Sequence, residues 1–186
     1  MIYLQKGSDL MNIAPTIVVN KDIIIRQPRE SDIQERFAIG RSLEFRKMVG
    51  GSVLNIPPYE YDNAERLYKR EMKNKLSWFI EYKGRMVGVC RLNERDNGLN
   101  RYSIGIYDEA LFSQGIGTIV TNTVLDYAFK ELKLAKVELM VLQFNKRAIR
   151  CYEKCGFVTK EILNDSLEVD GEKYNDIIME KLNPYL

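Results

Sequence analysis

Two glycines stand one residue apart in the stretch LFSQGIGTIVTNTVLDYAFKEL (residues 111–132) and lead into a long amphipathic segment. From Ile116 the apolar residues recur at the i, i+3, i+4 spacing of a helix, which we expect to begin near Gly117 or Thr118. The first N–H groups of such a helix have no partner inside it, and glycines let another group approach the backbone closely. The pattern indicates a site for phosphate or another anion, although Gly115 and Gly117 could equally make only a tight turn.

The loop fits neither common nucleotide-binding motif. A nucleoside triphosphate loop carries Lys and then Ser or Thr after its glycines, whereas Gly117 is followed by Thr118 and Ile119. A dinucleotide loop needs a third glycine, and Val120 stands at that position. A phosphate-bearing ligand bound here would therefore be held by a different kind of loop.

A second polar stretch, NKRAIRCYEKCGF (residues 145–157), follows directly on an apolar segment, residues 136–144, that reads as a central strand. Asn145 stands at the end of that strand, where ligands gather in α/β sheets. Helical spacing brings Ala148 and Tyr152 one turn apart. Alternatively, Asn145 only caps the helix and Tyr152 only packs in the core.

The chain contains no histidine, which excludes a Ser–His or Cys–His nucleophile. A general base must then be a carboxylate, a Lys, a Tyr, the chain's own amine or water. The three cysteines, Cys90, Cys151 and Cys155, are an odd number without a histidine or a second Cys pair. Free thiols are therefore expected, and no metal.

The 186 residues suffice for one domain, and 45% hydrophobic with 29% charged residues is ordinary for a soluble globular protein. A net charge of +2 favours neither a nucleic-acid nor a membrane partner. No apolar run approaches the roughly 18 residues of a membrane span, and polar residues interrupt the start. We expect a cytoplasmic protein with a flexible tail at residues 1–15, where Met11 is a second candidate start, and a single domain at residues 16–186.

The hydrophobic patterns predict a mixed α/β layer around one sheet in the order β-α-α-β-β-β-α-β-α-β-β. The pairs Lys83–Gly84 and Asp170–Gly171 predict hairpin turns, and Gly156 predicts a helix end. Capping boxes are expected at the starts of the first two helices, namely Ser31 with Gln34 and Asp62 with Glu65.

Together, the strand SIGIY, the loop EALFSQGIGT with its helix, the pattern N-x-x-A-I-x-x-Y-x-K-x-G-F and the hairpin DGEKYNDIIMEKL resemble the GNAT superfamily of acetyl-CoA-dependent N-acetyltransferases. The resemblance covers about residues 23–182 and is nearest the branch with ribosomal-protein N-terminal and spermidine acetyltransferases. It implies an α/β (α+β) GNAT fold, with a central mixed, mostly antiparallel sheet of about six to seven strands flanked by about four helices.

The implied activity is transfer of an acetyl group from acetyl-CoA to a primary amine by direct attack in a ternary complex. The acceptor would be a peptide or protein N-terminus, a polyamine or another small amine, and the residues do not separate these. Two alternatives stay open: a catalytically silent acetyl-CoA sensor and a non-enzymatic α/β interaction module. Because many members dimerise, a homodimer is also compatible with the resemblance.

The resemblance also assigns residues to acetyl-CoA. The loop before the helix would hold the pyrophosphate, the preceding strand would pair with the pantetheine arm, and the polar helix would contact pantetheine and the thioester. The residues so assigned are Ser113, Gln114, Gly115, Gly117 and Thr118; Ile104, Ile106 and Tyr107; and Asn145, Ala148 and Tyr152. Gly105 fits a close backbone approach or a bulge.

In the implied mechanism, Tyr152 protonates the leaving thiolate and a backbone N–H of SIGIY holds the oxyanion. Many relatives carry a glutamate on this strand, which here has no carboxylate. Glu81 and Glu94 are the candidate bases, although each could be an exposed charge and a water chain could serve instead. For the acceptor wall the resemblance suggests the loop at residues 50–61 and the first two helices, with Glu44, Phe45, Tyr59 and Trp78 either shaping it or simply packing.

Overall fold

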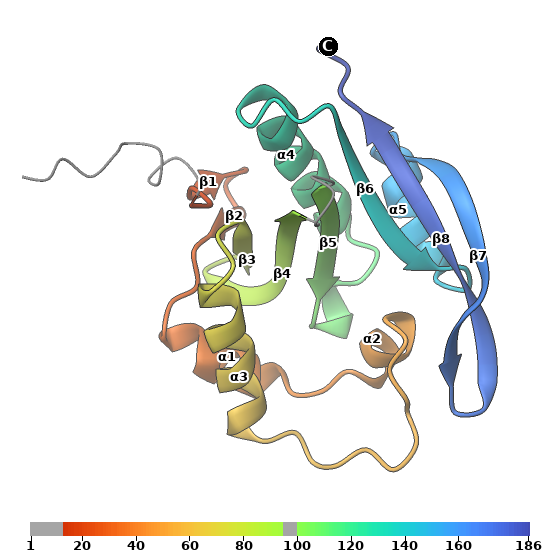
Figure 1. Ribbon diagram of the computed structural model, residues 1–186. Coiled ribbons are helices and arrows are strands. Elements are labelled where there is room, and N and C mark those ends of the chain that lie inside the picture. Colours follow the sequence, from red (N-terminus) through yellow and green to blue (C-terminus); the bar gives the residue numbers. More distant parts are fainter. Residues whose placement is uncertain (1–12, 95–99) are drawn as a thin grey trace, which may run out of the picture.

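A single eight-stranded sheet runs through the protein in the order β1-β2-β3-β4-β5-β6-β8-β7. The computed structural model describes residues 13–94 and 100–186 (Figure 1). Neighbouring strands are antiparallel except β5 and β6, which are parallel. The strands are β1 (Ile17–Val18), β2 (Ile23–Arg26), β3 (Ser77–Tyr82), β4 (Arg85–Glu94), β5 (Asn100–Ile106), β6 (Lys136–Leu142), β7 (Val158–Val169) and β8 (Glu172–Leu182).

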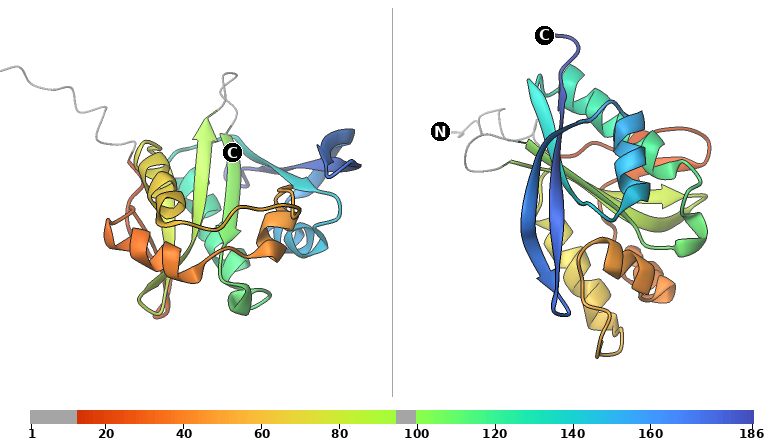
Figure 2. Two further views of the ribbon diagram at one scale, coloured as in Figure 1. Left: turned by 90° about the horizontal axis from the view of Figure 1, so that it is seen from below. Right: turned by 90° about the vertical axis from the view of Figure 1, so that its right-hand side faces the viewer.

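Helices cover both faces of the sheet. Within the described residues they are α1 (Ser31–Ile39), α2 (Leu43–Met48), α3 (Tyr61–Met72), α4 (Ile116–Lys130) and α5 (Lys146–Lys154), with a 3-10 turn, η2 (Glu109–Leu111). Alternate residues of β3 divide between two cores: Trp78 and Ile80 join the larger core with α4, while Phe79 joins a smaller one. Helix α4 also packs on α5, and the right-hand view of Figure 2 shows the two side by side.

The GNAT fold expected from the sequence is confirmed, with one more strand and one more helix than expected. Residues 17–26 form two strands, because the Asn20 side chain accepts the Asp22 and Ile23 N–H groups at 2.9 and 2.8 Å and turns the chain back. The first helix predicted from the sequence, expected to start at Ser31, is broken at Gly40, whose φ of 72° lies in the left-handed region. The remainder of that segment becomes the separate helix α2.

The predicted hairpin turns are confirmed. Lys83 and Gly84 have φ of 50° and 78°, and Asp170 and Gly171 have φ of 54° and 80°, as a two-residue turn between twisted strands requires. Gly156, with φ of 83°, follows α5 as expected.

Both predicted capping boxes are wrong. In α1 the N-cap is Glu30, without a side-chain cap bond, because Asp32 accepts the Arg29 N–H at 2.6 Å instead. In α3 the reciprocal pair is Glu60 with Asn63, so the helix begins at Tyr61. The residues expected to cap α3 form i,i+4 ion pairs on its surface instead, Asp62 with Arg66 and Glu65 with Lys69.

The domain's contacts begin two residues before the expected boundary. Ala14 is buried, and its N–H donates to the Lys75 carbonyl at 2.7 Å. The Pro15 carbonyl accepts a hydrogen bond from the Trp78 indole at 2.8 Å. Residues 14 and 15, which were expected in the tail, therefore contact the domain, whereas residues 1–12, Met11 among them, lie outside the described residues.

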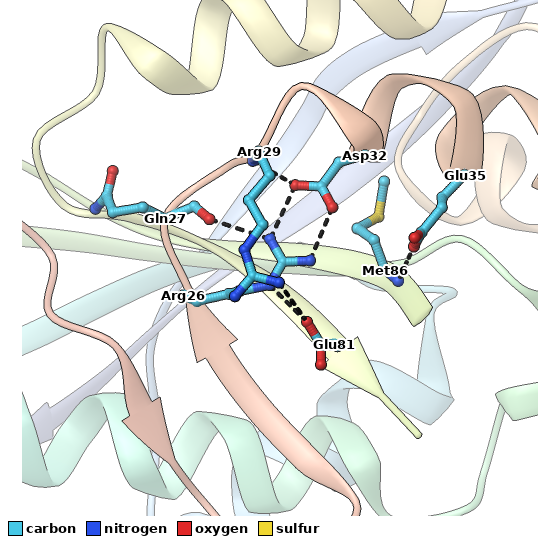
Figure 3. A network of polar contacts seen from close by, with 7 residues as sticks. All are labelled: Arg26, Gln27, Arg29, Asp32, Glu35, Glu81 and Met86. Atoms are coloured by element: carbon cyan, nitrogen blue, oxygen red, sulfur yellow. Dashed lines mark hydrogen bonds and ion pairs between the residues drawn. The ribbon is translucent and has the colours of Figure 1, made fainter. Parts of the chain in front are cut away.

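A buried ion-pair network joins β2, α1 and β3 (Figure 3). The Arg26 guanidinium donates to both Asp32 oxygens at 2.8 and 2.9 Å and through Nε to Glu81 at 2.6 Å. Arg26 and Asp32 are 3% and 0% exposed, so neither charge is solvated by bulk water. Each depends on the other for compensation.

Candidate active site

Strands β5 and β6 open a cleft in the middle of the sheet. They pair only at Arg101 and Glu138 and then diverge, as Figure 1 shows. A cavity of about 540 Å³ fills the gap, lined by β5, the loop into α4, the end of β6, α2, α5 and the β7–β8 hairpin. The structure brings to it all but one of the residues assigned to acetyl-CoA: Ile104, Ile106, Ser113, Gln114, Gly115, Gly117, Thr118, Asn145, Ala148 and Tyr152.

The start of α4 has free N–H groups of the kind that an anion-binding site requires. Gly115, with φ of 83°, is its N-cap, and the Ile119 N–H donates to the Gly115 carbonyl at 3.0 Å. The N–H groups of residues 116–118 therefore precede the helical ladder and remain available, at the positive end of the helix dipole. The helix begins at Ile116, one residue before the predicted range. Three cations of α5 line the same cavity: Arg147, Arg150 and Lys154.

The β5 wall offers backbone groups to the cleft. The Tyr107 N–H donates to the Val87 carbonyl of β4 at 2.8 Å. Because successive N–H groups along a strand point to opposite edges, those of Ile104 and Ile106 point toward the divergence from β6. These two N–H groups can pair with an extended ligand or with an oxyanion.

Tyr107 is the cofactor candidate that the structure does not bring to the cleft. It is buried on the other face of the sheet, edge-on to Phe45 with ring centroids 5.3 Å apart, and it lines a second cavity. Burial raises its pKa to about 12, and the Arg36 guanidinium lies 4.2 Å from its ring centroid. Gly105 makes the predicted close approach, but to a side chain: an added Cβ would lie 2.9 Å from the Phe45 ring.

Asn145 caps α5, as one reading of the sequence predicted, and it also lines the cavity. Its side-chain oxygen accepts the Ala148 N–H at 3.1 Å and so caps α5. Its Nδ2 donates to the Met48 carbonyl at the end of α2 at 3.0 Å. The residue lines the cavity at the same time, so it connects α2 and α5 across the cleft.

Tyr152 also packs and faces the cavity. It is 7% exposed, and its ring lies edge-on to Phe157 with centroids 5.9 Å apart. Burial, followed by the nearby Cys151 and Cys155, raises the pKa of its phenol above the ordinary value. Within residues 13–94 and 100–186 its hydroxyl has no hydrogen-bond partner. A protonated phenol with an unused O–H is suited to giving a proton to a ligand.

Of the two candidate bases, Glu81 is not brought to the cleft. Glu81 is held by Arg26, and Arg29 lies 3.6 Å from the same carboxylate, so its charge is already compensated. Neither cavity is lined by Glu81. Glu94 ends β4, and its side chain lies outside the described residues.

Of the four acceptor candidates, only Phe45 lines the cleft. Trp78 is fully buried against Tyr127, because its position on β3 points it into the larger core. Tyr59 lies against Arg36 and stacks on Phe37. Glu44 is exposed on α2 and pairs at 3.4 Å with Arg147 of α5, which places it at the rim.

Sequence reasoning missed the one carboxylate among the described lining residues, Asp176, as well as Ser103 and the three cations of α5. Asp176 is buried on β8 and lines the cavity beside Leu142, its cross-strand partner on β6. One sequence feature could have identified Asp176: it is a carboxylate at the start of the apolar run DIIM, at a position where the strand pattern predicts a buried residue.

Cys151 lies in the cleft beside the glycine loop. Its sulfur is 3.3 Å from the Thr118 hydroxyl and 3.5 Å from where a Cβ on Gly117 would stand. The pairing with the neighbouring Cys155 thiol, which outweighs burial, and the Thr118 hydroxyl lower the pKa of Cys151 to about 6. The same pairing raises the pKa of Cys155, and burial raises that of Cys90.

We expect iodoacetamide to alkylate Cys151 first, and an excess of acetyl-CoA to slow the reaction. Since the thiolate is the nucleophile, the rate should rise with pH through about 6 and level off above about 7, whereas an ordinary thiol would follow a pKa near 8.5. Rates measured by mass spectrometry between pH 5 and 9 check this. Cys151→Ser is the control and should be almost unreactive, and a rate still climbing steeply from pH 7 to 9 would contradict the lowered pKa.

Comparison with known proteins agrees with this geometry. The family profile described as "Acetyltransferase (GNAT) domain" matches residues 22–158. The chain is 31% identical over 160 residues to the probable N-acetyltransferase YjcK of Bacillus subtilis, covering 85% of each chain. It is 32% identical over 127 residues to the spermidine N(1)-acetyltransferase of Vibrio cholerae, covering 64% of this chain and 72% of that one.

Among solved structures, the microcin C7 self-immunity acetyltransferase MccE, in complex with acetyl-CoA and AMP, superposes with a TM-score of 0.77 at 14% identity. The match covers 92% of this chain and 98% of that one, which shows a shared fold. The chain therefore belongs to the GNAT acetyltransferase family, and it is an N-acetyltransferase.

Two further observations concern the described part of the chain. None of its helices has the length and apolar character to cross a membrane. Among the same residues, no three Cys, Asp or Glu side chains gather as metal ligands would.

Proposed function

We propose that this protein binds acetyl-CoA in the cleft between β5 and β6 and transfers its acetyl group directly to a primary amine. The observation that carries the proposal is the convergence on one cavity of three unlike groups. These are the unpaired N–H groups at the start of α4, the edge N–H groups of β5 and the buried hydroxyl of Tyr152. The N–H groups at the start of α4 match an anionic pyrophosphate, those of β5 match an extended amide arm, and the Tyr152 hydroxyl matches a thioester.

The reaction then proceeds as follows. The amine, with a pKa of about 8 for an α-amine or 10 for an alkylamine, loses one proton and attacks the acetyl carbon. A nitrogen–carbon bond forms, and an N–H of Ile104 or Ile106 stabilises the oxyanion. The carbon–sulfur bond breaks, the thiolate takes the proton of Tyr152, and the second proton of the nitrogen returns to the phenolate. One proton is released in each turnover.

Binding of acetyl-CoA is tested by calorimetric titration. Gly117→Asp is expected to raise the Kd at least tenfold, because a carboxylate at the helix start repels the pyrophosphate, and tenfold corresponds to only about 1.4 kcal/mol. The fold should tolerate the change, since an added Cβ meets only the Cys151 sulfur, at 3.5 Å. Asn122→Asp, an equal charge change at an exposed position of α4, is the matched control and should leave the Kd unchanged.

The same titration separates the alternatives. Binding of acetyl-CoA with thiol release on adding amines supports transfer. Binding without thiol release from any amine would favour a silent sensor. No binding to the folded protein would contradict the proposal and favour an interaction module.

A further inference from the structure

Among the described residues that line the cleft there is a single carboxylate, Asp176, and it is buried. Its cross-strand partner is Leu142, and the next pair, Ile177 with Val141, belongs to the core beneath α4 and α5. Because side chains alternate along a strand, Asp176 and Leu142 point to the other face, toward α2. Asp176 and Tyr152 line the same cavity, so an amine held at Asp176 would lie in the cavity proposed to hold the thioester.

The carboxylate is held on one side only. Ser166 of β7 donates to Asp176 Oδ2 at 3.0 Å, and the Asp176 N–H donates to the Ser166 hydroxyl at 2.9 Å. No described residue donates to Oδ1, and no described cation pairs with the carboxylate. At 8% exposure and with its residue lining the cavity, Oδ1 is an oriented acceptor without a partner.

The charges that line the cavity are divided between two elements. Asp176 is the only carboxylate among the described lining residues, and the three cations all belong to α5. The lining residues from α2, its C-cap, the end of β6 and β7 include a group of apolar side chains: Phe45, Met48, Val49, Leu142 and Leu167. Gly50 lies against this group, since a Cβ there would lie 2.6 Å from the Leu167 side chain.

This environment suits one positive charge on an apolar body. A buried carboxylate is stabilised by an ammonium that donates to its free oxygen. A second ammonium on the same molecule would lie against apolar side chains without a counter-charge, which costs free energy. Apolar atoms of the acceptor would instead gain from burial there.

Building on the proposed function, we propose that Asp176 binds the ammonium group of the acceptor through Oδ1, and that the acceptor is a primary amine with one positive charge on an apolar body. Ser166 orients the carboxylate. The chemistry is shared by a small apolar monoamine and by a peptide with an apolar free N-terminus. Polyamines, which carry several charges, are disfavoured.

The test is steady-state kinetics of thiol release with 2-phenylethylamine, the peptide amide Met-Leu-Phe and spermidine as acceptors. We expect kcat/KM for at least one of the first two to exceed that for spermidine by about tenfold or more. The faster of those two identifies the source of the amine. A preference for spermidine, or no acetylation of the first two by protein that binds acetyl-CoA, would overturn the assigned substrate class.

The role of Asp176 itself is tested with Asp176→Asn, which is expected to lower kcat/KM for the preferred amine by about thirtyfold or more while leaving the Kd of acetyl-CoA unchanged. Asp165→Asn, an equal charge change at an exposed position of β7, is the control and should have no effect. Asp176→Glu keeps the charge and should retain more activity than Asp176→Asn.

Equal activity of wild type and Asp176→Asn would overturn the proposal, as would Asp176→Glu being no better than Asp176→Asn in folded protein. Failure of the wild type to bind acetyl-CoA would instead count against the proposed function. The two failures are therefore distinguishable.

Discussion

Tyr152→Phe is expected to lower kcat by about 10²-fold or more, because general acid catalysis contributes roughly 10² to 10⁴ and the hydroxyl is the only group removed. The thiolate must otherwise take its proton from water. Since the hydroxyl has no partner within the described residues, the variant should fold normally. Its ring keeps the contact with Phe157.

The measurement is single-turnover and steady-state thiol release, together with a titration of acetyl-CoA. We expect the Kd of acetyl-CoA to change less than threefold while kcat falls. Tyr127→Phe is the matched control. Tyr127, on α4, packs edge-on to Trp78 of β3 and does not line the cleft. Full kcat in Tyr152→Phe with binding intact would remove Tyr152 from the mechanism.

The pH dependence gives a second check on the same residue. Burial raises the pKa of the Tyr152 phenol, so the acid stays protonated to higher pH than a free phenol near 10. The kcat of the wild type should therefore show no loss attributable to this group between pH 7 and 9.

Arg26→Met is expected to destabilise the fold by about 3–5 kcal/mol, because removing one partner of a buried ion pair leaves an uncompensated charge. Asp32, fully buried, would lose two hydrogen bonds and Glu81 would lose one. A loss of this size is a large fraction of the roughly 5–15 kcal/mol that stabilises a typical domain.

Urea unfolding followed by circular dichroism measures this loss as a lower midpoint at an unchanged m-value. Arg29→Met is the control: Arg29 is 63% exposed, and its side chain approaches only Glu81, at 3.6 Å, so the expected change is below about 1 kcal/mol. Similar stability for the two variants would show that the network contributes little.

The network also explains why Glu81, a candidate base from the sequence, is not available as a base in the structure. A glutamate on a strand of the sheet has the right chemistry for a base. Its availability depends on Arg26, which is 55 residues away along the chain. No local pattern reports that pairing.

The positions of other candidate residues were also not predicted from the sequence, because they depend on contacts between distant parts of the chain. Trp78 and Phe79 are adjacent in sequence and point into different cores, and which core is beside the ligand depends on the helix packed there. Gly105 was compatible with a close backbone approach or a bulge; the structure shows a close approach by the Phe45 ring of α2, a helix that the sequence did not separate from α1.

The sequence by itself determined the glycine-led start of α4, the Asn145 cap and the position of Tyr152 on α5, and the hairpin turns at Gly84 and Gly171. These features depend on neighbours within one helical turn or on single φ values, so their residue patterns are local. Only the tertiary structure decided which charges are free. It paired Glu81 with Arg26 and left Asp176 Oδ1 without a partner among the described residues, because the energy of a buried charge depends on long-range partners that spacing along the chain does not encode.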